Sequence, residues 1–103
     1  MARFWQDLGM QESTEISRHQ LLIVRALAGG EWQTNQQIAE STGVARRTVR
    51  LHTLRLVSQG IAEVAQVFPG HRYRLVQKAS RQNHPYWDRL VRAGEALGIT
   101  IAR

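Results

Sequence analysis

Residues 36–60, with the sequence QQIAESTGVARRTVRLHTLRLVSQG, constrain the fold of this chain more than any other stretch. A short helix-forming run is followed by Thr42-Gly43-Val44 and then by a longer basic run that ends at Gly60. Gly43 permits the left-handed backbone that a three-residue turn between helices requires. Val44 supplies an apolar side chain between the two helices, and Gly60 is a typical helix stop. The stretch therefore predicts a helix-turn-helix hairpin.

Two capping boxes mark the starts of helices in the first half of the chain. Ser17-Arg18-His19-Gln20 opens a first helix, for which Thr14 is a rival start, and Thr34-Asn35-Gln36-Gln37 opens the second. A third helix is expected from about Ala45 to Gln59, although Ala45 stands where a Ser or Thr cap is favoured. The first helix ends at Gly29-Gly30, and its buried stripe consists of Leu21, Val24, Leu27 and Ala28.

After Gly60 the hydrophobic period changes from helical to two, which predicts strands over residues 61–68 and 72–76. Phe68-Pro69-Gly70-His71 between them predicts a turn in which Gly70 has a positive φ. Alternation in the second strand directs Tyr73 and Leu75 toward the helices, and Arg72 and Arg74 outward. The sequence therefore predicts a basic two-stranded hairpin directly after a basic helix.

The C-terminal part begins with a polar linker, residues 78–82, and continues as a last helix. Pro85 fits its first turn, with Asn83 or His84 as the cap. The apolar side of this helix either completes the core of the protomer or forms a dimer contact, and we favour the dimer contact slightly. That side consists of Trp87, Leu90, Val91, Gly94 and Leu97.

The predicted organisation has three parts. Residues 1–14 form an N-terminal extension whose apolar side chains Phe4, Trp5 and Leu8 indicate docking on an unidentified surface. Residues 15–77 form one folded domain, and residues 78–103 form the linker and the last helix. The fold class is α+β, with a core of three helices and a two-stranded β hairpin.

Positive charge is concentrated in one segment. The chain has a net charge of +6, but residues 46–81 contain eight basic residues and one acidic residue, so this segment carries +7 and the rest −1. A segregated field of one sign is what phosphate binding requires, because affinity for nucleic acid comes largely from neutralising phosphates. The alternative is a solvated basic face kept for solubility, which does not require segregation. The charge pattern therefore favours nucleic acid as a partner.

Several other classes of protein are disfavoured by what the sequence lacks. There is no cysteine, no apolar run of membrane-spanning length and no secretion signal, so we expect a cytoplasmic, nucleoid-associated protein. His19, His52, His71 and His84 lack the spacing of a metal site and are expected at the surface or at its boundary. No catalytic triad or nucleotide-binding glycine loop occurs, so no enzyme activity, cofactor or metal is predicted. The chain offers little room for a separate effector domain.

The order helix, helix, turn, helix, basic hairpin resembles the winged helix-turn-helix family of DNA-binding domains over roughly residues 15–77. The resemblance implies a bacterial or phage transcriptional regulator that binds duplex DNA, with dimerisation through an appended helix. The residues that carry it are Thr34, Ile38-Ala39, Gly43-Val44, Arg46-Arg47-Thr48-Val49-Arg50, Leu56-Val57, Gly60-Ile61 and His71-Arg72-Tyr73-Arg74-Leu75.

Helical spacing assigns roles within the third helix. Arg47, Thr48 and Arg50 point away from the core near the start of the helix, so they are candidates for base contacts in the major groove. Arg46 and Arg55 are candidates for phosphate contacts. By analogy with the family, the DNA backbone is also held by Thr34, Asn35 and Gln36. In the wing, His71, Arg72 and Arg74 are candidates for contacts with the adjacent minor groove or its phosphates.

Three residues of the third helix depart from the family pattern. Thr53 takes a core position where the family usually has Leu, so weaker packing is expected. Leu51 and Leu54 lie on the outward side, where Arg or Lys is common. One of them could contact a thymine methyl group, but contact with another apolar protein surface is favoured. Leu51, Leu54, Trp87, Leu90 and Leu97 are therefore the protein-interface candidates.

The predicted function is sequence-specific binding of duplex DNA by a homodimer that regulates transcription. Two alternatives remain open. In the first, the chain binds DNA but acts in plasmid or phage replication or partition, or as an accessory DNA-bending factor. The other is a winged helix used for protein–protein assembly, which exposed Leu51 and Leu54 would support. The sequence leaves the operator, the direction of regulation and any effector unassigned.

Overall fold

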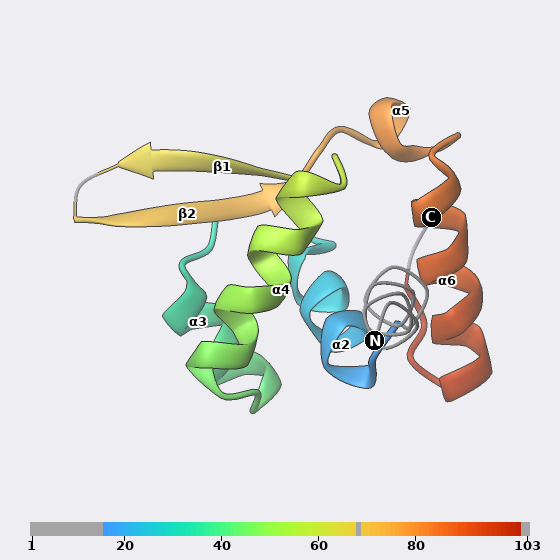
Figure 1. Ribbon diagram of the computed structural model, residues 1–103, viewed down its shortest axis with the longest axis horizontal. Helices are drawn as coiled ribbons and strands as arrows, with labels where there is room; N and C mark the ends of the chain where they lie inside the picture. Colours follow the sequence, from blue (N-terminus) through green and yellow to red (C-terminus); the bar gives the residue numbers. More distant parts are fainter. Residues whose placement is uncertain (1–15, 68, 102–103) are drawn as a thin grey trace, which may run out of the picture.

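The computed structural model describes residues 16–67 and 69–101. In chain order the elements are α2 (Arg18–Leu27), α3 (Asn35–Thr42), α4 (Arg46–Ser58), β1 (Ala62–Val67), β2 (Gly70–Leu75), α5 (Lys78–Arg81) and α6 (Pro85–Leu97). Helices α2, α3 and α4 pack together, the β hairpin projects to one side, and α6 lies on the other side of α2 (Figure 1). The predicted α+β architecture is confirmed, while the expected N-terminal contacts of Phe4, Trp5 and Leu8 lie outside the described residues.

The helices begin and end where local chemistry predicts. Ser17 caps α2 by accepting a hydrogen bond from the Gln20 N–H at 3.2 Å. Thr34 and Gln37 form both halves of the capping box of α3. Gly43, with φ of 75°, turns the chain between α3 and α4 in the left-handed conformation that a residue with a side chain rarely adopts. The predicted helix-turn-helix hairpin is therefore confirmed.

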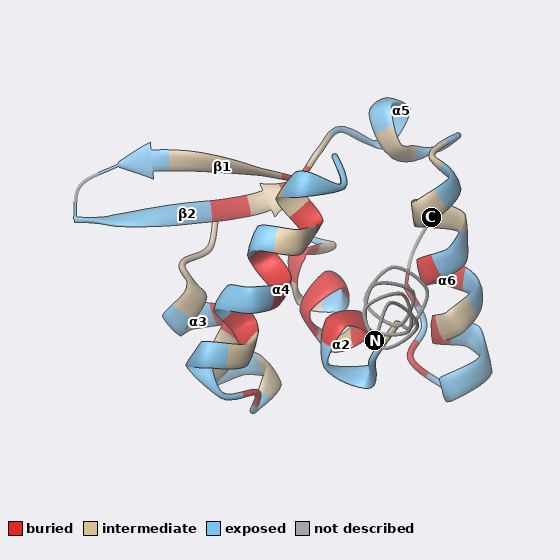
Figure 2. Ribbon diagram, viewed as in Figure 1, coloured by how far each residue is buried: buried red, intermediate tan, exposed pale blue. Residues whose placement is uncertain are grey.

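The hydrophobic core lies around α2, which supplies four fully buried apolar side chains, Leu21, Ile23, Val24 and Leu27. The opposing helices supply Ile38, Val49, Leu56 and Leu90, each fully buried, and buried positions face inward on every long helix (Figure 2). Burying apolar area contributes about 25 cal/mol per Å² and is the main stabilising term in such a small domain. The core therefore fixes the positions of α3 and α4 relative to each other.

The hairpin is antiparallel, with Val64 paired with Tyr73 and Val67 paired with Gly70. Gln33 forms an isolated antiparallel bridge with Tyr73 through two backbone hydrogen bonds of 2.8 and 2.9 Å, while the sheet itself has two strands. Gly70 already belongs to β2 and does not have a positive φ, so that part of the turn prediction is wrong. The inward alternation of Tyr73 and Leu75 is confirmed, because both side chains are buried.

The C-terminal part differs from the prediction at two points. The expected linker contains the short helix α5. The cation of Arg81 at its end stacks over the Trp87 ring at 4.7 Å, which ties α5 to α6. Trp87 and Leu90 are buried in the protomer, so the core alternative is right for them and their role as interface candidates is corrected. Leu97 is 49% exposed and remains a candidate.

The chain folds back across α6 after its end. His84 caps the start of this helix by accepting from the Tyr86 N–H at 3.1 Å, as predicted for one of its two cap candidates. After Gly98, the Ile99 N–H donates to the Gly94 carbonyl at 2.7 Å. A Cβ atom on Gly94 would overlap the backbone carbonyl of Ile99. Gly94 therefore permits the close approach that buries Ile99 and Ile101 against the helix.

Candidate nucleic-acid interface

Helix α4 separates its residues between a buried side and an exposed side. Val49, His52, Thr53 and Leu56 are buried. Arg46, Arg47 and Arg50 are exposed, whereas Thr48 and Arg55 are half-buried. The predicted outward direction of Arg47 and Arg50 agrees with this exposure, and their contacts with bases stay a prediction.

A groove lies between the starts of α3 and α4 and the hairpin. It has a volume of about 260 Å³, and no acidic side chain lines it. Arginine side chains and an imidazole from different elements converge here, so the groove has the sign of charge that attracts phosphate. Five of the lining residues are candidates named from the sequence, and the full lining is Asn35, Gln36, Arg46, Arg50, Gly70, His71 and Tyr73.

Backbone N–H groups also face solvent at the starts of these two helices. Thr34 is occupied as the cap of α3, since its hydroxyl accepts from the Gln37 N–H at 3.1 Å. Within residues 16–67 and 69–101, nothing accepts from the N–H groups of Asn35 and Gln36. Ala45 provides no side-chain cap for α4. The first turns of both helices therefore keep hydrogen-bond donors for an anion.

Thr53 links the two helices that line the groove, which the sequence did not suggest. Its side chain is fully buried, and its Oγ1 lies 3.0 Å from Asn35 Oδ1 and 3.1 Å from the Arg50 carbonyl. A hydroxyl has one proton, so it donates to one of these acceptors at a time. The expected weak packing at Thr53 is thus offset by a polar link that positions the start of α3 against α4. The sequence signal that could have indicated this link is a polar residue at a core position of an amphipathic helix.

The wing places its basic residues on different faces. His71 lines the groove, whereas exposed Arg72 lies on the outer face with Trp32, Ala65 and Val67, beside a hollow of about 370 Å³. Arg74 is used internally, because its Nε donates to Glu63 Oε2 at 2.9 Å and its cation lies 4.2 Å from the centre of the Trp32 ring. Trp32 therefore packs under Arg74 and does not enter the core. Arg72 and Arg74 are not brought to the groove.

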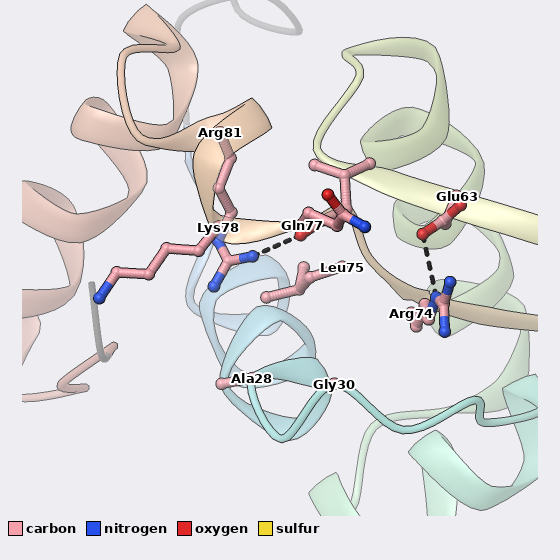
Figure 3. A pocket seen from close by; sticks show the side chains of 9 residues that line it. Ala28, Gly30, Glu63, Arg74, Leu75, Gln77, Lys78 and Arg81 are labelled. Carbon is pink, nitrogen blue, oxygen red and sulfur yellow. Dashed lines mark hydrogen bonds and ion pairs between the residues drawn. The ribbon is translucent and has the colours of Figure 1, made fainter.

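A second hollow, of about 290 Å³, lies at the root of the wing between β2, α5 and the end of α2 (Figure 3). Arg81 donates from Nη1 to the Val76 carbonyl, and its Nε has no partner among the described residues. Burial lowers the pKa of Arg81 from its ordinary value. Lys78 extends away from the Arg74–Glu63 pair in Figure 3, so the cations around this hollow do not converge. The contacts of Arg81 hold the wing root in place.

His52 is buried, contrary to the expectation of a surface or boundary position. Burial, followed by the charges of Arg55 and His19, lowers the pKa of His52 from 6.5 to about 4. Its Nε2 lies 3.4 Å from Ser17 Oγ, and its Nδ1 has no partner in the part of the chain that the structure describes. The imidazole is therefore neutral at pH 7 and acts as a packing residue between α2 and α4.

The described residues do not meet the requirements of a metal site or of a membrane-spanning helix. Across residues 16–67 and 69–101, His, Asp and Glu side chains form no cluster suited to holding a metal ion. None of the described helices combines the length and apolar character needed to cross a membrane.

Comparisons with known proteins give structural matches only. No protein-family model and no curated protein sequence matches the chain. The structure is similar to the winged helix-turn-helix DNA-binding domain of Mb0332 from Mycobacterium bovis, with a TM-score of 0.59 and 20% identity over 99% of this chain and 92% of that one. The transcriptional repressor BigR from Xylella fastidiosa gives a TM-score of 0.58 and 18% identity over 94% and 92% of the two chains.

ZitR of Lactococcus lactis is a third match, with a TM-score of 0.55 and 18% identity over 82% of this chain. The match spans 62% of the length of ZitR. These identities are too low to transfer a function, but the agreement in architecture holds across several proteins. The helix-turn-helix hairpin, the antiparallel wing and these matches together establish that the chain has the winged helix-turn-helix fold.

Proposed function

We propose that this chain binds duplex DNA, with the first half of α4 in the major groove and the wing on the adjacent backbone, and that it regulates transcription. The observation that carries the proposal is the groove lined by Asn35, Gln36, Arg46, Arg50 and His71, whose lining contains no acidic side chain. A phosphate placed there would neutralise the charge of Arg46 and accept hydrogen bonds from the unpaired N–H groups of α3.

The exposed residues of α4 divide into two roles. Arg47, Thr48 and Arg50 are the proposed base contacts, because a guanidinium can donate two hydrogen bonds to the O6 and N7 atoms of guanine. Arg46 and Arg55 are the proposed phosphate contacts. Thr34 acts indirectly as the cap that orients Asn35 and Gln36. In the wing, His71 and Arg72 remain DNA candidates, whereas Arg74 stabilises the wing through Glu63 and Trp32.

The regulatory role and a homodimer are supported by what the structural neighbours are. BigR is a transcriptional repressor, SlyA is a transcriptional regulator, and the Mb0332 domain is homodimeric. A dimer of this chain would read paired half-sites. A small-molecule effector is compatible with the fold, because the neighbour NadR was solved in complex with 4-hydroxyphenylacetate. We assign no catalytic step to the chain.

The proposal is tested by measuring duplex affinity as a function of salt. Arg50→Ala should weaken binding to the preferred site by about 1–3 kcal/mol and relax its specificity. Arg46→Ala should weaken binding to all sequences and reduce the slope of log K against log salt by about 0.9. Arg92→Ala is the matched control, because Arg92 is an exposed arginine on α6, away from the groove, that pairs with Asp88. Binding that is independent of salt and of Arg46 and Arg50 would reject the proposal.

The second candidate function, protein–protein assembly, is favoured by the exposure of Leu51 and Leu54 on α4. It predicts self-association or partner binding that is insensitive to salt and abolished by Leu54→Asp, without any shift of duplex DNA. Sedimentation of the free chain, combined with a gel-shift titration of duplex DNA, separates the two functions in one set of variants.

A further inference from the structure

We propose that Leu51 and Leu54 contact thymine methyl groups in the major groove, next to the bases that Arg47 and Arg50 contact. This inference rests on the proposed DNA-binding function and adds a sequence preference to it. It assigns to DNA a surface for which the sequence favoured a protein partner.

The two leucines continue the side of α4 that carries the arginines. Leu51 follows Arg47 by one helical turn, and Leu54 follows Arg50 by one turn, so each leucine is stacked about 5–6 Å beyond an arginine on the same side. Leu51 is 45% exposed and Leu54 is 52% exposed. Because they are three residues apart, their side chains form one apolar patch, directed away from buried Val49 and Leu56.

Charge decides between DNA and a second copy of the chain as the occupant of this patch. Helix α4 contains four arginines and no acidic residue. A second copy that used the same patch would bring the arginines of both helices together, and like charges facing each other are destabilising. DNA supplies both partners at once, since its phosphates neutralise the arginines while the groove floor presents apolar groups.

The apolar group in question is specific to one base. In the major groove, thymine presents a C5-methyl group beside its O4 acceptor, whereas cytosine presents an amino group. A leucine side chain offers no hydrogen bond, so it gains from a methyl group and loses when it removes water from a polar base edge without replacing the hydrogen bond. The preferred site should therefore contain thymines adjacent to the guanines contacted by Arg47 and Arg50.

The experiment removes single methyl groups from the DNA. A preferred duplex is first selected from a random pool with the full chain, and each thymine near its guanines is then replaced in turn by deoxyuridine, which lacks only the C5-methyl group. We expect at least one replacement to weaken binding by about fourfold, the equivalent of one apolar carbon removed from water. Leu51→Ala or Leu54→Ala should bring the thymine-to-deoxyuridine affinity ratio at that position to about one.

Leu97→Ala is the matched control for the leucine variants. Leu97 is a leucine of similar exposure, 49%, but it lies near the end of α6. Its truncation should leave the thymine-to-deoxyuridine ratio unchanged, even if it alters the overall affinity through a dimer contact. All three leucines are on the surface, and alanine is a strong helix former, so the variants should fold.

The outcomes separate this inference from the proposed function. A thymine-to-deoxyuridine affinity ratio of one at every thymine overturns the inference, and so does a ratio that neither leucine variant changes. In both cases, weaker binding by Arg50→Ala would still support the proposed DNA binding. Loss of self-association on Leu51→Ala in sedimentation without DNA also overturns it, in favour of a second copy as the occupant. Duplex affinity that is independent of salt and unchanged by both Arg46→Ala and Arg50→Ala would overturn the proposed function itself.

Discussion

Helices α4 and α6 are both 13 residues long, yet they differ in which side chains they bury and which they expose. Helix α6 buries Trp87, Leu90 and Val91, starts with Pro85 after a side-chain cap, and leaves one large apolar residue exposed. Helix α4 has no cap, buries two polar side chains, and exposes Leu51 and Leu54 among its arginines. Both helices therefore supply fully buried apolar side chains to the core. They differ in their exposed sides, because α4 also exposes two leucines beside its arginines, where we propose that it contacts DNA.

The strongest test of this difference compares the truncation of a buried leucine in α6 with the truncation of an exposed leucine in α4. Leu90→Ala should lower the free energy of unfolding by about 2–5 kcal/mol, because it leaves a cavity at a fully buried position. Leu54→Ala, the same substitution at a position that is 52% exposed, should change it by no more than about 0.5 kcal/mol. Urea titrations of both variants measure the two changes, and equal losses would mean that Leu54 is not exposed in the way described.

A second variant tests the close packing of α6. Gly94→Ala should destabilise the fold by about 1–3 kcal/mol, because the added methyl group overlaps the Ile99 carbonyl and must displace the returning chain. An exposed helical glycine would give the opposite sign, since alanine is the better helix former. Thermal unfolding of Gly94→Ala distinguishes the two, and a stabilised variant would mean that Ile99 and Ile101 do not pack against α6.

Acid should weaken the protein through the buried side of α4. Burial first, then Arg55 and His19, lowers the pKa of His52 to about 4, below its ordinary 6.5, so the unfolded chain takes up the proton first. His52 thus has no effect on stability above about pH 6.5, and stability falls as the pH drops from there to 4, by at most about 1.4 kcal/mol per pH unit. His52→Gln removes the titration, and its unfolding free energy should fall less over this range. Parallel pH profiles would exclude His52 as the cause.

The smallest expected effect concerns the starts of the two helices. Ala45→Ser should give α4 the cap it lacks and stabilise the domain by about 1 kcal/mol. His84→Ala should remove the existing cap of α6 and destabilise the domain by a similar amount. The pair of denaturation curves should shift in opposite directions. A null result for Ala45→Ser would indicate that the missing cap is not a weakness of α4.

Local sequence signals identified most of the fold. The cap at Ser17, the capping box at Thr34, Gly43 in the turn and the alternation around Tyr73 each depend on a few neighbouring residues, and the structure agrees with them. The capping box expected at Ser17 is only half formed, because the Gln20 side chain donates to Tyr86. Features that depend on residues far apart in the chain were not predictable in this way. The link between Thr53 and Asn35 and the stacking of Arg74 on Trp32 arise only after the elements pack together.

The candidate site shows the same limit. The sequence named the basic residues of α4 and the wing, but it could not show that His71 faces the groove while Arg74 is paired with Glu63. Helical spacing placed Trp87 and Leu90 on the apolar side of α6, yet the choice between core and interface depended on the packing of α2. Such choices require tertiary contacts and not periodicity.

Because the start of α4 has no side-chain cap, hydrogen exchange at the Thr48 backbone amide should report on phosphate binding. In α3 the third amide, that of Gln37, donates to Thr34 Oγ1, whereas α4 offers no side-chain acceptor for the equivalent amide of Thr48. An amide that is solvated and unbonded exchanges its proton for deuterium without waiting for the helix to open. Thr48 should therefore exchange faster than Gln37 in the free protein. A phosphate at the start of α4 would slow Thr48 first, so occupancy could be followed at a single residue of the unmodified chain.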